Sequence, residues 1–246
     1  MKIAEGIHML DISSEVTGKT ETVHPMLIAS DQSAVLVDTG FPGQFDQLKA
    51  TLADHDVPLE KLTDILITHQ DLDHIGNLPQ VVAESSPQVR VWAHEAEQPY
   101  IQGEKSLLKY KLEAVEQLPK EVPEAFREGL KSLILNPPTA RVDQLLEDGQ
   151  ELPIAGGITV IFTPGHSPGH LSLYLNESKT LIAADAMMVD DGQLNGPAPQ
   201  ATPDMNLANQ SLKKFIPHDI EKVVCYHGGL FEDDPNKRIS ELANAD

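Results

Sequence analysis

The feature that most constrains how this chain can fold is a set of four short apolar runs, each followed at once by residues that can bind a metal ion. The runs cover residues 64–68, 158–162, 180–184 and 222–226. Short apolar runs of this kind are typical of strands that are covered on both faces. Because loops at one edge of a sheet let rigid strands aim side chains at a shared point, the four ends predict one site. Its expected members are His69, Asp71, Asp73, His74, His166, Asp185 and His227.

The segments between these runs alternate between strand and helix signals. Residues 25–38 predict two strands joined by a turn at Ser30 to Ser33, and residues 89–92 predict another strand. Apolar residues at helical spacing predict helices near residues 44–55, 75–84, 206–215 and 235–244. Strands interleaved with helices favour a layered α/β arrangement.

A different composition marks residues 95–135, which are rich in Glu and Lys. Pro119 and Pro123 separate two stretches in this segment. The apolar residues expected to line one helix face in each stretch are Leu107, Leu108, Leu112, Val115 and Leu118, then Phe126, Leu130, Leu133 and Ile134. These features predict a helical insertion, which is either an ordinary surface helix pair or a lid or dimer surface.

The spacing within residues 69–74 has a direct chemical interpretation. Imidazole nitrogens and carboxylate oxygens both bind zinc, iron and manganese. In an irregular loop after a strand, His69 and Asp71 can face one ion while Asp73 and His74 turn towards a second. A single carboxylate such as Asp185 can bridge two cations through its two oxygens, and two adjacent cations let many acidic groups converge without mutual repulsion.

These motifs resemble those of the metallo-β-lactamase superfamily, whose signature is His-x-His-x-Asp-His followed by a Gly-His, an Asp after a strand and a late His. The resemblance covers residues 7 to 230 and includes Leu-Val-Asp-Thr-Gly at residues 36–40. It implies a single domain over residues 1–246, with the four-layer αβ/βα sandwich of that family and the helical insertion at 95–135. The combined motif order is specific for the fold and only weakly specific for the substrate.

The resemblance also implies a ligand set and a mechanism. The first ion would take His69, Asp71 and His166, the second would take Asp73, His74 and His227, and Asp185 would bridge them. A hydroxide between the two divalent ions would be the nucleophile, because metal binding lowers the pKa of water towards neutrality. Asp73 and Asp185 are therefore the expected catalytic residues, with Asp73 also handling a proton.

This chain departs from the family pattern at Asp71, where most members have His. Zinc is the first expectation for the metal, but a carboxylate at this position favours iron or manganese more than an imidazole would. Flavodiiron proteins of the same superfamily have Glu at the equivalent place. They also have a flavin domain, which 246 residues of this composition do not provide.

Three residues near the predicted ligands have lesser roles. Asp38 is expected to orient a ligand or to cap a turn. His170 lies four residues after His166, and we expect a structural or orienting role for it because only one of the two is needed as a ligand. Cys225 is expected to be a buried, inert thiol.

Bulk properties limit the classes of partner. The net charge of −20 argues against nucleic acid, because phosphates require local Lys and Arg. The sequence contains no stretch of about 18 apolar residues, so it does not predict a membrane span. The first residues lack the apolar segment of a secretory signal, and the single cysteine fits a reducing compartment, so we expect a cytoplasmic protein. The expected partner is a small-molecule substrate, with a homodimer as a further option.

The leading functional hypothesis is a metal-dependent hydrolase that cleaves a small ester, thioester or lactone. The alternatives are a di-iron redox protein related to flavodiiron proteins, a phosphodiesterase, and a non-catalytic binding protein stabilised by metal. Metal analysis and a panel of hydrolysable substrates separate these hypotheses.

Overall fold

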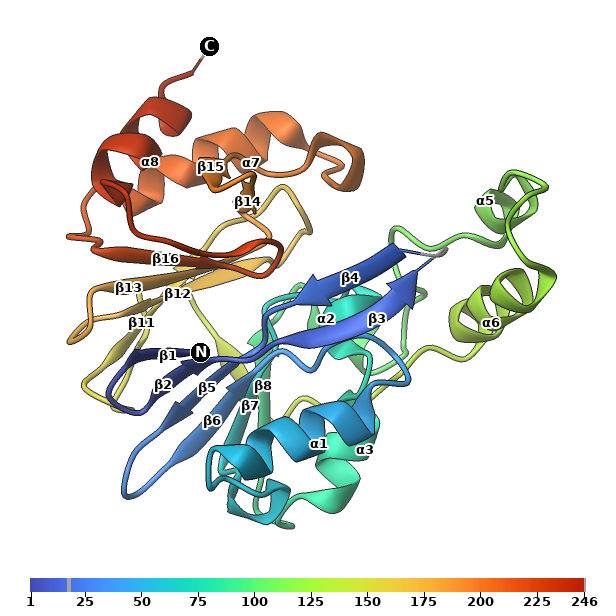
Figure 1. Cartoon of the computed structure of the whole chain (residues 1–246), viewed down its shortest axis with the longest axis horizontal. Coiled ribbons are helices and arrows are strands. Elements are labelled where there is room, and N and C mark those ends of the chain that lie inside the picture. Colours follow the sequence, from blue (N-terminus) through green and yellow to red (C-terminus); the bar gives the residue numbers. More distant parts are fainter. Residues whose placement is uncertain (17–18, 246) are drawn as a thin grey trace.

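The computed structural model describes residues 1–16 and 19–245, and its centre is a pair of β-sheets that face each other (Figure 1). One sheet has seven strands and the other has six. The first sheet contains, in spatial order, β1 (Lys2–Ala4), β2 (Ile7–Met9), β5 (Met26–Ala29), β6 (Ala34–Val37), β7 (Asp64–Leu66), β8 (Arg90–His94) and β9 (Gln144–Leu146). The second contains β10 (Glu151–Leu152), β11 (Ile158–Phe162), β12 (Leu171–Leu175), β13 (Thr180–Ala184), β16 (Lys222–Cys225) and β17 (Gly229–Phe231).

Helices cover the outer face of each sheet. The helices associated with the first sheet are α1 (Phe45–Asp54), η1 (Leu59–Lys61), α2 (Leu72–Ile75), α3 (Leu78–Glu84) and α4 (Gln98–Ile101). Those that follow the second sheet's strands are η2 (Pro199–Ala201), α7 (Met205–Ser211), η3 (Leu212–Phe215) and α8 (Pro235–Ala243). Two hairpins complete the body: β3 (Ile12–Val16) with β4 (Lys19–Val23), and β14 (Met188–Asp190) with β15 (Gln193–Asn195).

Three apolar clusters hold these layers together. Val37, Leu66 and Val160 belong to the cluster between the sheets, whereas Leu48 of α1 packs on the outer face of the first sheet and Ile239 of α8 on that of the second. Burying both faces explains why the central strands are apolar throughout. The predicted four-layer αβ/βα sandwich is therefore confirmed.

The strands that precede the candidate ligands end at one edge of the sandwich. In the first sheet, β6, β7 and β8 run parallel, and in the second β13 runs parallel to β16. Parallel strands present their carboxyl ends on the same side. The loops that begin at Asp38, Ile67, Asp185 and Tyr226 therefore meet at that edge.

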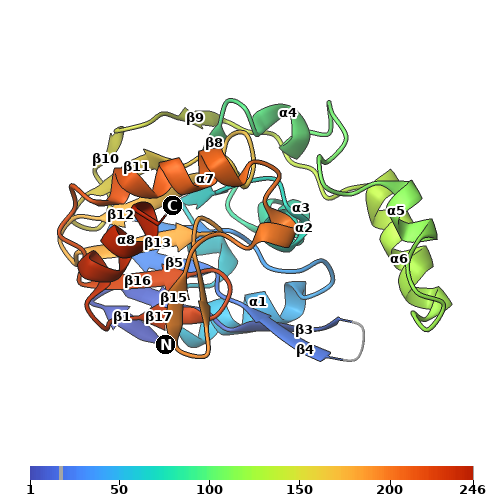
Figure 2. The same cartoon turned by 90° about the horizontal axis from the view of Figure 1, so that it is seen from above.

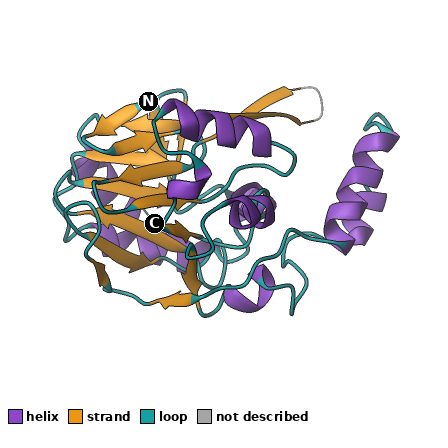
Figure 3. Ribbon diagram, turned by 90° about the horizontal axis from the view of Figure 1, so that it is seen from below, coloured by secondary structure: helices purple, strands orange, loops and turns teal. Residues whose placement is uncertain are grey.

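Residues 95–135 differ in part from the expected pair of surface helices. The segment contains α4, then α5 (Leu112–Glu116) and α6 (Glu124–Leu135), and α5 with α6 stands away from the two sheets (Figures 1 and 2). We call residues 112–135 the arm, which Figure 3 also shows as a separate helical element. The predicted helix face that included Leu107 and Leu108 is wrong, because α5 begins only at Leu112 and Leu107 is buried in the main core.

The helices in the described part of the chain are all too short or too polar to cross a membrane.

Candidate metal centre

The first group of converging side chains comprises His69, Asp71, His166 and Asp185, whose ligand atoms lie within 4.8 Å of one another. His166 Nε2 is 3.1 Å from Asp71 Oδ2 and 3.3 Å from Asp185 Oδ2. His69 Nε2 is 3.3 Å from Asp71 Oδ2. Ligands about 2.1 Å from one tetrahedral ion lie about 3.4 Å apart. The separations in this group therefore suit a single ion.

The second group comprises Asp73, His74 and His227. His227 Nε2 lies 3.2 Å from Asp73 Oδ2, and His74 Nε2 lies 3.8 Å from it. Asp185 connects the two groups, since its Oδ1 is 3.4 Å from His74 Nε2 and its Oδ2 is 3.6 Å from His227 Nε2. The structure thus brings together all seven side chains that the sequence singled out.

Several buried polar atoms in this cluster have no hydrogen-bond partner, and this indicates whether the cluster suits metal ions. Among the described residues, His69 Nε2, Asp71 Oδ1, His74 Nε2 and Asp185 Oδ1 are buried without a hydrogen-bond partner. Buried polar groups in folded proteins are almost always paired, so each exception requires an explanation. Four unpartnered nitrogen and carboxylate oxygen atoms that point into one cluster form a donor set suited to divalent ions.

Asp38 fixes the orientation of two of the imidazoles. Its carboxylate accepts hydrogen bonds from His74 Nδ1 at 2.8 Å and from the Thr68 hydroxyl at 2.8 Å. Because that hydroxyl donates to Asp38, it can accept one from His69 Nδ1, which lies 3.1 Å away. Both imidazoles then turn Nε2 towards the cluster, as carboxylate partners do for metal-binding histidines.

The one-turn helix α2 positions Asp73 and His74. Gly76 follows this helix, and a Cβ atom there would collide with the backbone of Gly40 and Pro42. The close approach of the two loops therefore requires glycine at this position. The Tyr226 ring stacks on His74 with centroids 3.8 Å apart, so this tyrosine packs against a candidate ligand.

His170 is an orienting residue, consistent with the expectation that His166 alone of the pair is a ligand. Its Nε2 accepts a hydrogen bond from the Asp185 backbone N–H at 3.1 Å, and its Nδ1 lies 2.8 Å from the Thr163 hydroxyl. Burial lowers the pKa of His170 well below its usual value, which keeps the ring neutral. A neutral ring can accept this hydrogen bond and so hold the loop of Asp185 in place.

Glu97 joins two of the loops that supply the first group, a role that no sequence pattern predicted. Its carboxylate accepts hydrogen bonds from Gln70 N and Gln70 Nε2, both at 3.0 Å. It also accepts from the Ser167 hydroxyl at 2.7 Å and from Gly169 N at 2.6 Å. The residue is fully buried, and with four donors around it the carboxylate ties His69 and Asp71 to the loop of His166.

Lys109 is the second functional residue that sequence reasoning missed. Its Nζ lies 2.5 Å from Asp71 Oδ2 and 2.6 Å from His166 Nε2. In the sequence it belongs to a stretch interpreted as surface helix, and no local signal directs a lysine there into the body. Only the non-helical course of residues 107–111 brings it to the first group.

The electrostatics of the centre are dominated by its own ion pairs. Burial opposes ionisation of Asp71 and Asp185, but the neighbouring histidines outweigh it and hold both pKa values well below the usual range. Burial likewise opposes protonation of His227, but Asp185 and Asp73 raise its pKa to about 10. The centre therefore keeps its carboxylates charged, and cationic partners stabilise them.

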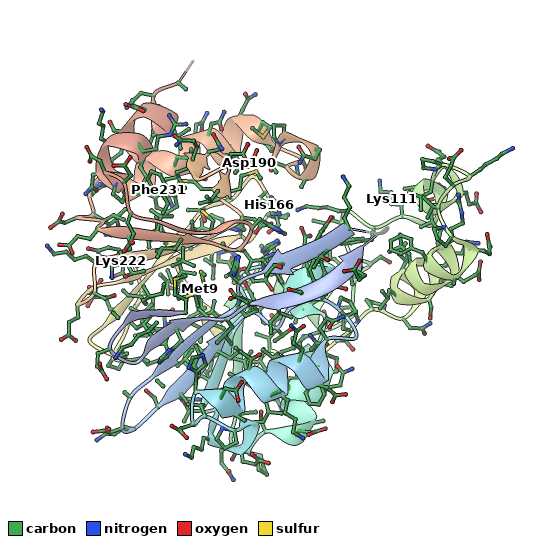
Figure 4. The ribbon with its side chains drawn as sticks, viewed as in Figure 1. Met9, Lys111, His166, Asp190, Lys222 and Phe231 are labelled. Atoms are coloured by element: carbon green, nitrogen blue, oxygen red, sulfur yellow. The ribbon has the colours of Figure 1, made fainter. Side chains whose placement is uncertain are left out.

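Two hollows open on either side of His166, which Figure 4 places at the edge of the body that faces the arm. One has a volume of about 370 Å³, and its walls include Leu108, Pro168 and Leu207. The other has a volume of about 210 Å³, and Met187 lies on its wall beside the candidate ligands His166, Asp185 and His227. Both are the size of small-molecule subsites.

Comparisons with known proteins agree with this geometry. A sequence model described as the metallo-beta-lactamase superfamily matches residues 19–227. The probable metallo-hydrolase YflN of Bacillus subtilis is 26% identical over 98% of this chain and 91% of its own. The atrochrysone carboxyl ACP thioesterase of Aspergillus fumigatus is 23% identical over 88% of this chain and 54% of its own.

Solved structures show the same fold. The metallo-beta-lactamase family protein TTHA1429 from Thermus thermophilus has a TM-score of 0.67 at 23% identity, over 98% of this chain and 79% of its own. The metallo-beta-lactamase from Hirschia baltica has a TM-score of 0.69 at 14% identity, over 100% and 97%. Since the family model covers most of the chain and the candidate metal ligands converge as its motif order implies, this chain belongs to the metallo-beta-lactamase superfamily.

Proposed function

We propose that this protein is a dinuclear metal-dependent hydrolase that cleaves a small ester, thioester or lactone. The observation that supports the proposal most strongly is the position of Asp185, whose carboxylate faces ligand atoms of both groups. Its Oδ1 lies near His74 and its Oδ2 near His166. A carboxylate placed in this way suits two neighbouring cations.

The proposed chemistry divides between the ions and the chain. Bound divalent ions would supply Lewis acidity and activate a water molecule for attack on a carbonyl carbon. In this scheme Asp73 and Asp185 hold the two positions at a fixed separation. Asp73 is also 16% exposed, so its carboxylate can exchange a proton with solvent at the open side of the centre. Buried Asp38 and His170 keep the ligands oriented.

The hollows on both sides of His166 support a small acyl substrate. The larger one presents Leu108, Pro203 and Leu207, which suit an apolar acyl or leaving group. The Aspergillus fumigatus relative is named as a thioesterase, which favours a thioester among the three substrate classes. The net charge of −20 agrees with a small substrate better than with a polyanion.

Asp71 supports a second candidate, a di-iron redox protein. It contributes a carboxylate to the first group where a typical family member has an imidazole, and carboxylate ligands shift the preference towards iron or manganese. The function and the metal can therefore be tested together.

The test is a substrate panel run on protein depleted of metal and reconstituted with zinc, manganese or iron. The panel contains p-nitrophenyl esters, acyl thioesters, lactones and bis-p-nitrophenyl phosphate. We expect turnover of a carbonyl substrate that disappears with a chelator and returns with zinc. Reductase activity with two irons and no hydrolysis would support the redox candidate instead. Bound metal with no turnover of any substrate, or turnover of the phosphodiester alone, would reject the proposal.

A further inference from the structure

Lys109 places a cation among the side chains that would ligate the first ion. Its Nζ contacts the same two atoms, Asp71 Oδ2 and His166 Nε2, that face each other across 3.1 Å in the first group. The Lys109 side chain is only 16% exposed. This lysine therefore differs from a surface lysine whose ammonium group extends into solvent.

The neighbours of Lys109 in the chain are anchored to the metal-binding loop itself. Leu108 N donates a hydrogen bond to Gln70 Oε1 at 2.9 Å, and the Tyr110 hydroxyl accepts one from Leu72 N at 3.2 Å. Leu107 is 5% exposed and packs in the main core. Attachments at Leu107, Leu108 and Tyr110 thus hold this part of the backbone so that Lys109 lies over the first group.

The contacts of Lys109 concern one of the two metal positions. Lys109 Nζ contacts Asp71 and His166 of the first group. Within the part of the chain that the structure describes, it has no hydrogen bond or ion pair with Asp73, His74 or His227 of the second group. Asp71 and the Lys109 ammonium are oppositely charged and largely shielded from water, so their attraction is weakened little by solvent. A divalent ion at the first position would need the same two ligand atoms that the Lys109 ammonium contacts.

We propose that Lys109 competes with the first metal ion for Asp71 and His166, so that the two positions fill in order. This inference rests on the metal centre proposed above. The second position binds its ion without displacing any group, whereas the first accepts an ion only when Lys109 withdraws. Because residues 107–110 lead directly into the arm, filling of the first position is coupled to a displacement at the base of the arm.

The test compares zinc binding by the wild type, Lys109→Met and Lys111→Met, starting from metal-depleted protein and using a competing chelator. Methionine keeps the length and apolar stem of lysine but removes the charge. Lys111 is the matched control, because it is an exposed lysine two residues away at the start of the arm (Figure 4). The measured quantities are the two zinc dissociation constants and the zinc content at saturation, and no substrate is involved.

We expect wild type to bind one zinc ion tightly and a second more weakly. Removing a cation that lies 2.5 Å from Asp71 Oδ2 and 2.6 Å from His166 Nε2 should strengthen the weaker binding at least about tenfold in Lys109→Met. The tighter constant should stay unchanged, and Lys111→Met should match wild type in both. Lys109→Ala provides the same comparison should the methionine variant fold poorly.

Equal constants for Lys109→Met and wild type would overturn the inference, as would weaker zinc binding by the variant. Either result leaves the hydrolase proposal untouched, since a substrate panel can succeed without competition by Lys109. Conversely, the expected change in zinc binding can be observed even if every panel substrate fails. Absence of any zinc binding by wild type would reject both.

Discussion

Replacing Asp185 with asparagine is expected to reduce hydrolytic turnover by at least about a thousandfold, because the loss of roughly 4 kcal/mol of transition-state stabilisation corresponds to that factor. Asparagine keeps the shape of the side chain but removes the charge and one of its two metal-binding oxygens. The Asp185 carboxylate faces both ligand groups, since Oδ1 lies 3.4 Å from His74 Nε2 and Oδ2 lies 3.3 Å from His166 Nε2 and 3.6 Å from His227 Nε2. The variant should therefore also retain less than its full complement of zinc.

The matched control is Asp190→Asn. Asp190 is an exposed aspartate at the end of β14, on the strand that follows Asp185 (Figure 4). We expect this variant to keep wild-type turnover and metal content when both proteins are assayed on the same substrate. If Asp185→Asn retained full activity and full metal content, Asp185 would not connect the two positions.

Replacing Glu97 with glutamine is expected to lower the free energy of unfolding by about 2–4 kcal/mol, because it disrupts hydrogen bonds to a fully buried group. In the native structure each Glu97 oxygen accepts two hydrogen bonds, one pair from Gln70 and the other from Ser167 and Gly169. A glutamine can place its carbonyl towards one pair only. Its amide would then face the other two donors, which lose their acceptor.

This effect should extend to the metal centre, because Glu97 joins the loop of His69 and Asp71 to the loop of His166. We expect zinc affinity at that position to fall by about 10- to 100-fold, as for other residues that orient metal ligands. Chemical denaturation and zinc titration measure the two effects. Glu95→Gln is the control, since Glu95 is exposed on the same short stretch. If Glu97→Gln had the same free energy of unfolding and the same zinc affinity as Glu95→Gln, the buried carboxylate would not be what holds the loops together.

The convergence of the candidate ligands could be predicted from sequence because they follow apolar strands within one or a few residues. Once β13 and β16 are recognised as parallel neighbours, sheet geometry places Asp185 and His227 at a common edge, and the stacking of the two sheets brings His69 after β7 to the same side. Local patterns also predicted the hairpin of β5 and β6 and the helices α1 and α8. In these segments, local spacing and tertiary burial favour the same structure.

Residues whose roles depend on distant contacts could not be found in this way. Glu97 and Lys109 lie in a stretch rich in Glu and Lys, which is typical of solvated helices, yet both are largely or fully buried. Their partners are Gln70, Asp71 and His166, which are far away in the sequence. Strand β4 could not be predicted either, because its first three residues are polar and exposed and the strand therefore lacks the alternation of apolar and polar residues that signals a strand.

The most direct test of the proposed centre is a crystal structure of zinc-saturated protein with anomalous scattering measured at the zinc edge. We predict two anomalous peaks, one within bonding distance of His69, Asp71 and His166, and one within bonding distance of Asp73, His74 and His227. Asp185 should contact both. Peaks confined to the protein surface, with no metal bound to these seven side chains, would contradict the assignment of a dinuclear metal centre.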